Sequence, residues 1–332
     1  MIRRMTLLSC CLVAMLPACR CDRASDETAA GPAGTSSDAI IVRTAASVPS
    51  LPPSTGSSAP IASASAPKPG RCPPDMVKVA GRYCVDRYES AMLDDQQRQA
   101  SPYYPILERG YDKWIEDRKA EADKLLGADE DGGGDGGRRG PGADLPFPEL
   151  PEWQRAAAAN VKAASKAEMI PNAYLSMHSS RDGCQRAGKR LCTLEEWRTA
   201  CRGEKNTRFP WGDDYKSGRC NVFREEHPGH VIYNRFTVGM LDPRMNLVTS
   251  GGKPLLRKTG ESPECKSAWG DDAVYDMIGN LDEWIDDPKG TFVGGFFSRN
   301  TKKGCDQVID GHTAGYADYS TGGRCCRDLM EP

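Results

Sequence analysis

The sequence carries no excess of charge of either sign, because 44 lysines and arginines face 46 acidic residues, giving a net charge of −2. A nucleic-acid partner is therefore not indicated. Only four histidines and no Cys-x-x-Cys pair occur, which disfavours a structural zinc site. The apolar stretch at residues 5–16 is too short to span a bilayer as a stable helix.

The first 70 residues predict an export signal followed by a tether. Arg3 and Arg4 precede the apolar stretch, and residues 16–19 read Leu-Pro-Ala-Cys, which resembles the lipobox of bacterial lipoproteins. Residues 1–18 are therefore interpreted as a lipoprotein signal peptide and Cys19 as the lipidation site; the alternative is an ordinary secretory signal. Residues 19–70, rich in Ala, Ser and Pro, predict a disordered tether. We expect an exported protein in the cell envelope, lipid-anchored to a bacterial membrane.

The cysteines agree with export. Of the 14, ten lie between Cys72 and Cys326, an even number that predicts a disulfide framework in an exported chain. Spacing alone does not fix the connectivity. The favoured pairs are local: Cys72 with Cys84, and Cys305 with Cys325 or Cys326.

Local patterns predict short strands and several helices. Alternation over residues 76–79 and 83–85 favours two strands joined by a turn at Ala80-Gly81. A charged helix is expected over residues 112–126, and an Ala-rich one over 149–169. Residues 106–169 are interpreted as an insertion outside the compact core.

Two further helices follow. Residues 172–187 place small and apolar residues on one stripe, and Gly188 ends that helix. Thr193 with Glu196 three residues later forms the pattern of a capping box, so a new helix begins there.

Residues 274–287, VYDMIGNLDEWIDD, combine a tight turn with many carboxylates. Gly279-Asn280 readily adopts positive φ. The acidic residues around it are Asp276, Asp282, Glu283, Asp286 and Asp287. Oxygen ligands on a sharply bent backbone are what Ca²⁺ prefers. The alternative is a solvated acidic turn above a Trp-rich core.

Six segments in order carry a resemblance: AGKRLCTLEEWRTACRG, FPWGDDY, CNV, VYDMIGNLDEWIDD, FVGGFFSR and GGRCC. Together they are similar to the formylglycine-generating enzyme, or sulfatase-modifying-factor, domain family. The resemblance implies an α+β fold for residues 71–332, a variant of the C-type-lectin-like fold with little regular secondary structure. Disulfides and calcium ions pin the loops of such domains.

The resemblance also implies calcium ligands. Asp276 and Glu283 match the positions that supply side-chain oxygens, and Gly279 and Leu281 those that supply carbonyls. A second calcium site would begin at Asn221 and Val222. Arg235 stands where an acidic residue should complete that second site, and it would repel a cation.

The family's enzymes oxidise a substrate cysteine to formylglycine with O₂, using two of their own cysteines to hold Cu(I). Soft thiolates select that ion. Here Arg299 and Gly304 occupy the two positions, with Cys305 one residue beyond the second. A two-thiolate copper site is therefore not expected. Cys305 and His312 remain as candidate catalytic residues.

The sequence accordingly favours a non-catalytic module that binds a protein or a glycan. The alternative is an oxidoreductase of the formylglycine-generating type, supported by fold alone, or an accessory to one that uses residues 106–169 to dock a partner.

Overall fold

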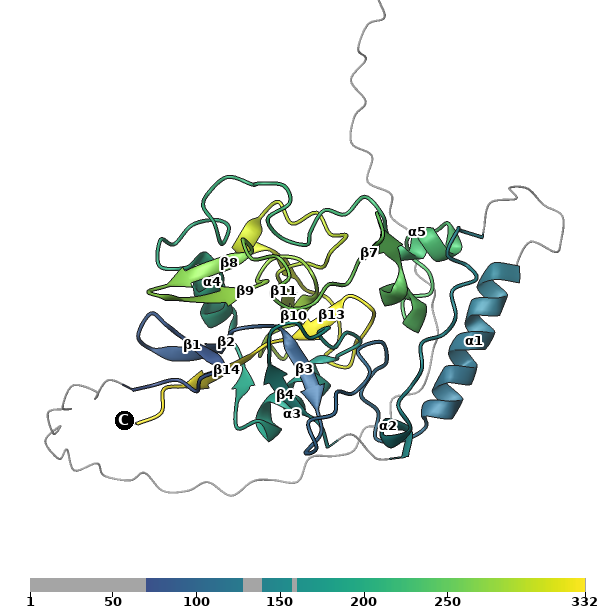
Figure 1. The fold of residues 1–332 in the computed structure, drawn as a ribbon, viewed down its shortest axis with the longest axis horizontal. Helices are drawn as coiled ribbons and strands as arrows, with labels where there is room; N and C mark the ends of the chain where they lie inside the picture. Colours follow the sequence, from purple (N-terminus) through teal and green to yellow (C-terminus); the bar gives the residue numbers. More distant parts are fainter. Residues whose placement is uncertain (1–69, 128–138, 157–159, 332) are drawn as a thin grey trace, which may run out of the picture. The chain divides into compact units, whose positions relative to one another are not determined.

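The computed structural model describes residues 70–127, 139–156 and 160–331 (Figure 1). The predicted signal peptide, Cys19 and all of the predicted tether but Gly70 lie outside this part. Within it, the helices are α1 (Tyr111–Gly127), α2 (Glu152–Ala156), α3 (Met177–Arg186), α4 (Leu194–Arg202) and α5 (Pro228–Tyr233), with 3-10 helices η1 (Pro243–Leu247) and η2 (Gly304–Asp306). The strands are β1 (Met76–Val79), β2 (Tyr83–Asp86), β3 (Ser90–Leu93), β4 (Lys162–Ser165), β5 (Arg190–Leu191), β6 (Thr249–Ser250), β7 (Lys253–Pro254), β8 (Lys266–Trp269), β9 (Asp272–Tyr275), β10 (Asp282–Trp284), β11 (Phe292–Val293), β12 (Val308–Ile309), β13 (Thr321–Gly323) and β14 (Cys325–Asp328).

One four-stranded antiparallel sheet has the strand order β1-β2-β14-β5 and joins the two ends of the domain. Figure 1 labels β1, β2 and β14 of this sheet. β14, near the C-terminus, lies between β2 and β5, with Cys326 opposite Val85 on one side and opposite Arg190 on the other. The predicted hairpin is confirmed, and its turn residues Ala80 and Gly81 both have positive φ. β14, close to the C-terminal end of the domain, is thus an inner strand beside β2, which comes from the first strands of the domain.

A second four-stranded sheet, in the order β12-β11-β10-β13, contains the strand that follows the acidic turn. β10 pairs in parallel with β13, which sets Glu283 opposite Gly322. The pairs β3–β4, β6–β7 and β8–β9 complete the strand pairing. Trp284 of β10 and Trp197 of α4 are fully buried, so the acidic turn is continuous with the core.

The capping prediction for α4 is confirmed: Thr193 accepts from the backbone N–H of Glu196, whose carboxylate accepts from Thr193 N. The helix expected over 172–187 begins later, at Met177, because Ser176 and Ser179 form another capping box. Gly188 follows it with a φ of 68°.

The Ala-rich helix expected over 149–169 is wrong in its second half. Lys162–Ser165 is instead strand β4, which pairs with β3, and Ala163 and Ser165 face inward. Cross-strand pairing and burial outweigh the helix propensity of alanine here.

The described part of residues 106–169 is not separate from the core, contrary to expectation. Ala122 of α1 packs in one cluster with Tyr233 and Met245, and Val161 and Ala163 pack in another beside Met177. The charged helix expected over 112–126 is confirmed as α1.

Five disulfides use all ten cysteines between Cys72 and Cys326. The expected Cys72–Cys84 pair is confirmed. The expected pairing of Cys305 with Cys325 or Cys326 is wrong. The other four pairs are Cys184–Cys325, Cys192–Cys326, Cys201–Cys305 and Cys220–Cys265.

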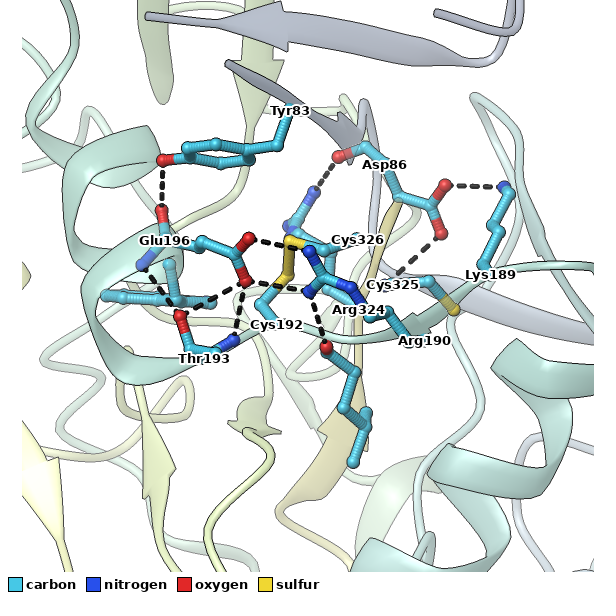
Figure 2. Close-up of a disulfide and its surroundings, with 12 residues drawn as sticks. Tyr83, Asp86, Lys189, Arg190, Cys192, Thr193, Glu196, Arg324, Cys325 and Cys326 are labelled. Carbon is cyan, nitrogen blue, oxygen red and sulfur yellow. Dashed lines mark hydrogen bonds and ion pairs between the residues drawn. A yellow bond between two sulfur atoms is a disulfide. The ribbon is translucent and has the colours of Figure 1, made fainter. Parts of the chain in front are cut away.

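The packing of two elements explains the error. Neighbouring residues of a strand point to opposite faces, so Cys325 and Cys326 on β14 reach different partners. Figure 2 shows Cys192–Cys326 between the capping box of α4 and Arg324. Cys305 lies in η2, which α4 holds through two arginines on Asp306.

No helix in the described ranges is both long enough and apolar enough to cross a membrane.

Candidate functional site

The turn at residues 276–281 has the sharply bent backbone that its sequence predicts. Asp276, Gly279 and Asn280 all have positive φ, at 57°, 85° and 59°. A Cβ on Gly279 would lie 2.2 Å from the carbonyl oxygen of Asn221, so only glycine fits there. Asn280 N donates to that same carbonyl oxygen, which locks the turn onto the segment at Asn221.

Three buried carboxylates gather behind this turn. Asp276 and Glu283 come from the motif, and Glu89, more than 180 residues earlier in the chain, completes the group. Asp276 accepts from the backbone N–H of Gly260, while Glu89 accepts from Asn280 Nδ2 at 2.6 Å and from Leu281 N at 3.1 Å. Sequence reasoning missed Glu89 because no local pattern links it to the motif.

One guanidinium, that of Arg324, lies among these carboxylates. Arg324 is fully buried and donates through Nε and Nη2 to both oxygens of Glu283. It also donates to the carbonyl of Asp86, as Figure 2 shows, and to the carbonyl of Tyr275. Trp197 Nε1 also donates to Glu283, at 2.6 Å. We call Glu89, Asp276, Glu283 and Arg324 the acidic hub.

The acidic hub contains more acid than base. Burial raises the pKa of Asp276 from 3.8 to about 7. Burial, and then the charges of Asp276 and Glu283, raise the pKa of Glu89 well above its usual range. Two of the three carboxylates therefore have no full cationic partner. They bind protons at low pH and, at higher pH, carry negative charge without a cationic partner among the described residues.

The predicted calcium ligands fit a cation in charge but not, as they stand, in geometry. Each oxygen of Glu283 already accepts two hydrogen bonds, from Arg324 and Trp197. Within the described residues, no group of three or more His, Cys, Asp or Glu side chains is arranged to hold a metal ion. Asp276, Glu283 and the carbonyls of Gly279 and Leu281 would hold calcium only if Glu283 gave up contacts with Arg324.

The predicted second calcium site does not fit a cation. Asn221 donates through Nδ2 to Asn280 Oδ1 and Leu255 O, and its own Oδ1 accepts from Arg224 Nε at 2.9 Å. A guanidinium thus lies at the predicted ligand atom. Arg235 donates to the carbonyl of Leu125 instead. The neighbouring Val222 is buried and packs in the core.

The positions of the family's copper cysteines hold no thiol. Arg299 donates to the buried carboxylate of Asp282 at 2.9 Å and lies over the ring of Phe296. Gly304 has a φ of 59°, and a Cβ there would lie 2.2 Å from the carbonyl oxygen of Arg208. Cys305 is bonded to Cys201. Burial raises the pKa of Asp282 to about 7.

The two histidines near this region have structural surroundings. His312, a predicted candidate, stacks on Phe292 and lies 4.2 Å, ring to ring, from Tyr316. His227, which sequence reasoning did not single out, accepts at Nδ1 from Gly229 N and contacts the hydroxyl of Tyr319 through Nε2. Burial lowers the pKa of His227 to about 4, so the ring is neutral at physiological pH.

Comparison with known proteins identifies the class. The model of the Sulfatase-modifying factor enzyme 1-like domain matches residues 100–324. The chain belongs to this family, and its fold is the formylglycine-generating-enzyme variant of the C-type-lectin-like fold, α+β and held by disulfides. The five disulfides are typical of an exported protein.

Among curated proteins, the "Inactive C-alpha-formylglycine-generating enzyme 2" of Bos taurus is 28% identical over 134 residues. The match covers 40% of this chain and 37% of the relative, so the chain spans little more than a third of that protein. Among solved structures, PvdO from Pseudomonas aeruginosa is 14% identical, with 74% of this chain and 80% of that chain covered and a TM-score of 0.34. The Major Tropism Determinant I1 variant is 11% identical, with 80% and 55% covered and a TM-score of 0.38.

Proposed function

We propose that this protein is a lipid-anchored, non-catalytic binding module that recognises a protein or glycan ligand outside the cell membrane. One observation carries the proposal: Cys305, the only cysteine next to the family's copper positions, forms a disulfide with Cys201. Arg299 and Gly304 occupy the positions themselves.

The chemistry of copper explains why this matters. Cu(I) is held by soft thiolates, and a sulfur in a disulfide has no thiolate to offer. All cysteines in the described part of the chain are bonded in this way. At the first position a cationic guanidinium, paired with Asp282, would also oppose a metal ion.

A relative supports the same interpretation. The curated relative from Bos taurus is named an inactive member of the formylglycine-generating enzymes. The same fold framework is thus compatible with a protein that lacks this activity.

The anchor rests on the sequence. Cys19 follows a lipobox-like Leu-Pro-Ala, and residues 19–70 would hold the domain away from the membrane surface. A Cys19→Ser variant, fractionated with the wild type, is expected in the soluble fraction. Retention of that variant in the membrane would reject lipid anchoring at Cys19.

An activity assay separates this function from the first alternative, an oxidoreductase of the formylglycine-generating type. Purified protein is incubated with Cu(I), O₂ and a peptide containing the family's Cys-x-Pro-x-Arg substrate motif, and an active formylglycine-generating enzyme serves as the positive control. We expect no aldehyde by mass spectrometry. Aldehyde above the level of a no-protein control would overturn the binding function in favour of the enzyme.

A further inference from the structure

Two arginines flank the amide pair that fastens the acidic turn. Arg224 Nε donates to Asn221 Oδ1 at 2.9 Å, and Asn221 Nδ2 donates to Asn280 Oδ1 at 2.9 Å. On the other side, Arg257 N donates to Asn280 Oδ1 at 3.0 Å, and Asn280 Nδ2 donates back to Arg257 O at 3.1 Å. The two asparagines therefore connect the Arg224 side chain to the backbone of Arg257.

Neither guanidinium has a carboxylate partner in the described structure. The one side-chain hydrogen bond of Arg224 goes to the neutral amide of Asn221. Arg257 Nε is buried and has no hydrogen-bond partner at all. Both side chains are half-buried, so water screens them incompletely. Buried donors without partners are uncommon and costly in folded proteins.

The carboxylates near Arg224 accept hydrogen bonds from groups other than the two arginines. Glu226 and Glu261 are the acidic groups that face Arg224, together with the hydroxyl of Tyr215. Glu226 accepts a hydrogen bond from the side chain of Ser250 and from its own backbone N–H. Glu261 accepts from the backbone N–H of Lys258. Burial, and then the like charge of Arg257, lower the pKa of Arg224. The charges of Glu226 and Glu261 act against this effect, but the pKa of Arg224 stays below its ordinary value.

The surroundings are suited to a ligand. Tyr215 is 41% exposed, one of two large hydrophobic side chains exposed in the described residues, and its ring packs on that of Phe223. Arg224 N donates to the carbonyl of Phe297, which ties the arginines to the segment that carries Arg299. A ligand held here would lie beside the region where the family's enzymes carry their copper cysteines.

We propose that Arg224 and Arg257 form a binding site for a compact oxyanion, namely a carboxylate, sulfate or phosphate group of the ligand. Planar guanidinium forks bind such groups through paired, charge-assisted hydrogen bonds. An oxyanion would supply negative charge to two half-buried guanidiniums that have no carboxylate in ion-pair contact within the described residues, and it would lower the repulsion between them. The site rests on the proposed binding function and gives its ligand a chemical class.

The test is a thermal-shift titration of the full chain with sodium sulfate, sodium phosphate and sodium acetate, balanced with sodium chloride to constant ionic strength. A bound anion raises the melting temperature in a saturable way. The tetrahedral ions and acetate distinguish a sulfate or phosphate source from a carboxylate source. Sulfate and phosphate also stabilise proteins in general by exclusion from the surface, so the decision rests on variants.

Arg224→Gln and Arg257→Gln are each expected to weaken binding of at least one of these anions by tenfold or more. Arg257→Lys keeps the charge but loses the fork, and should bind less tightly than wild type. The matched control is Arg181→Gln, because Arg181 is already paired with Asp286 and its loss changes the net charge equally. It should bind as wild type does.

Equal anion-dependent shifts in wild type, control and site variants would overturn the site, as would no saturable shift with any of the three anions. Circular dichroism shows which variants are folded, and Arg257→Lys decides if a glutamine variant is not. The titration and the copper assay have independent outcomes. A negative titration would reject the anion site only, whereas aldehyde in the copper assay would reject the non-catalytic function.

Discussion

The guanidinium of Arg324 donates to both carboxylate oxygens of Glu283, and the two side chains are only 0% and 1% exposed. Arg324 lies on the loop between β13 and β14, and Glu283 on β10, so this ion pair connects the two four-stranded sheets. Removal of one partner of a buried ion pair leaves a charge without compensation. We therefore expect the ion pair of the acidic hub to stabilise the fold by connecting the two sheets.

Arg324→Met is expected to lower the free energy of unfolding by about 3–5 kcal/mol, because Glu283 would remain buried next to Asp276 and Glu89. Urea denaturation of wild type and variant measures it. Adding Glu283→Gln to that variant should restore part of the loss. The control is Lys113→Ala, whose ion pair with Asp117 is exposed on α1 and contributes less than about 1 kcal/mol. If Arg324→Met loses as little free energy of unfolding as the control, the ion pair does not stabilise the connection between the sheets.

Stability should fall as the pH rises through the acidic range toward neutrality. Burial raises the pKa of Asp276 and of Asp282 to about 7, and that of Asp86 to about 6. Between about pH 4 and pH 7 the folded protein binds protons that the unfolded chain has released, so raising the pH favours unfolding. In the presence of a chelator, the melting temperature is expected to be higher at pH 5.5 than at pH 8. Asp276→Asn should reduce this difference, and an equal difference in that variant would exclude Asp276 as a cause.

Calcium binding at the acidic hub is expected to change the melting temperature in a pH-dependent way. A cation competes with the protons on Asp276, so calcium should raise the melting temperature at pH 8 and much less at pH 5.5. Asp276→Asn and Glu283→Gln should both diminish the effect at pH 8. Absence of any calcium-dependent shift at either pH would reject calcium at the acidic hub and leave Arg324 as its cation.

Local features of this fold could be predicted from sequence, and long-range ones could not. Thr193 and Glu196 are three residues apart, so their spacing alone defines the cap. The turn at Gly279 was predictable for the same reason. Glu89, by contrast, reaches the hub through tertiary structure, as does the bridge from Asn221 to Asn280.

The partner of Cys305 could not be read from the sequence either. Cys201 precedes it by 104 residues, whereas Cys325 and Cys326 lie close by along the chain. Proximity in sequence favours the nearer cysteines through loop entropy. The packing of η2 on α4 and the alternation of β14 override that preference.

The disulfide map is a direct test of this arrangement. Proteolysis of unreduced, alkylated protein followed by mass spectrometry should yield a linked peptide pair containing Cys201 and Cys305. Separate pairs should link Cys184 to Cys325 and Cys192 to Cys326. A link from Cys305 to either terminal cysteine would contradict the structure, and a free thiol at Cys305 would reopen copper chemistry at Arg299.

Gly279→Ala tests how the turn and the proposed anion site depend on each other. The new Cβ would lie 2.2 Å from Asn221 O at a φ of 85°, so we expect a loss of about 2–4 kcal/mol from strain and overpacking. Gly311→Ala is the matched control, because Gly311 has nearly the same φ, 86°, and no heavy atom within 4 Å of its Cβ position. That variant should lose only about 1 kcal/mol, the cost of the left-handed backbone alone. Because the clash displaces Asn221, which bonds to Arg224, Gly279→Ala should also weaken anion binding where the protein is still folded. Equal losses of stability in the two variants, as measured by urea denaturation, would show that the contact between Gly279 and Asn221 does not hold the turn in place.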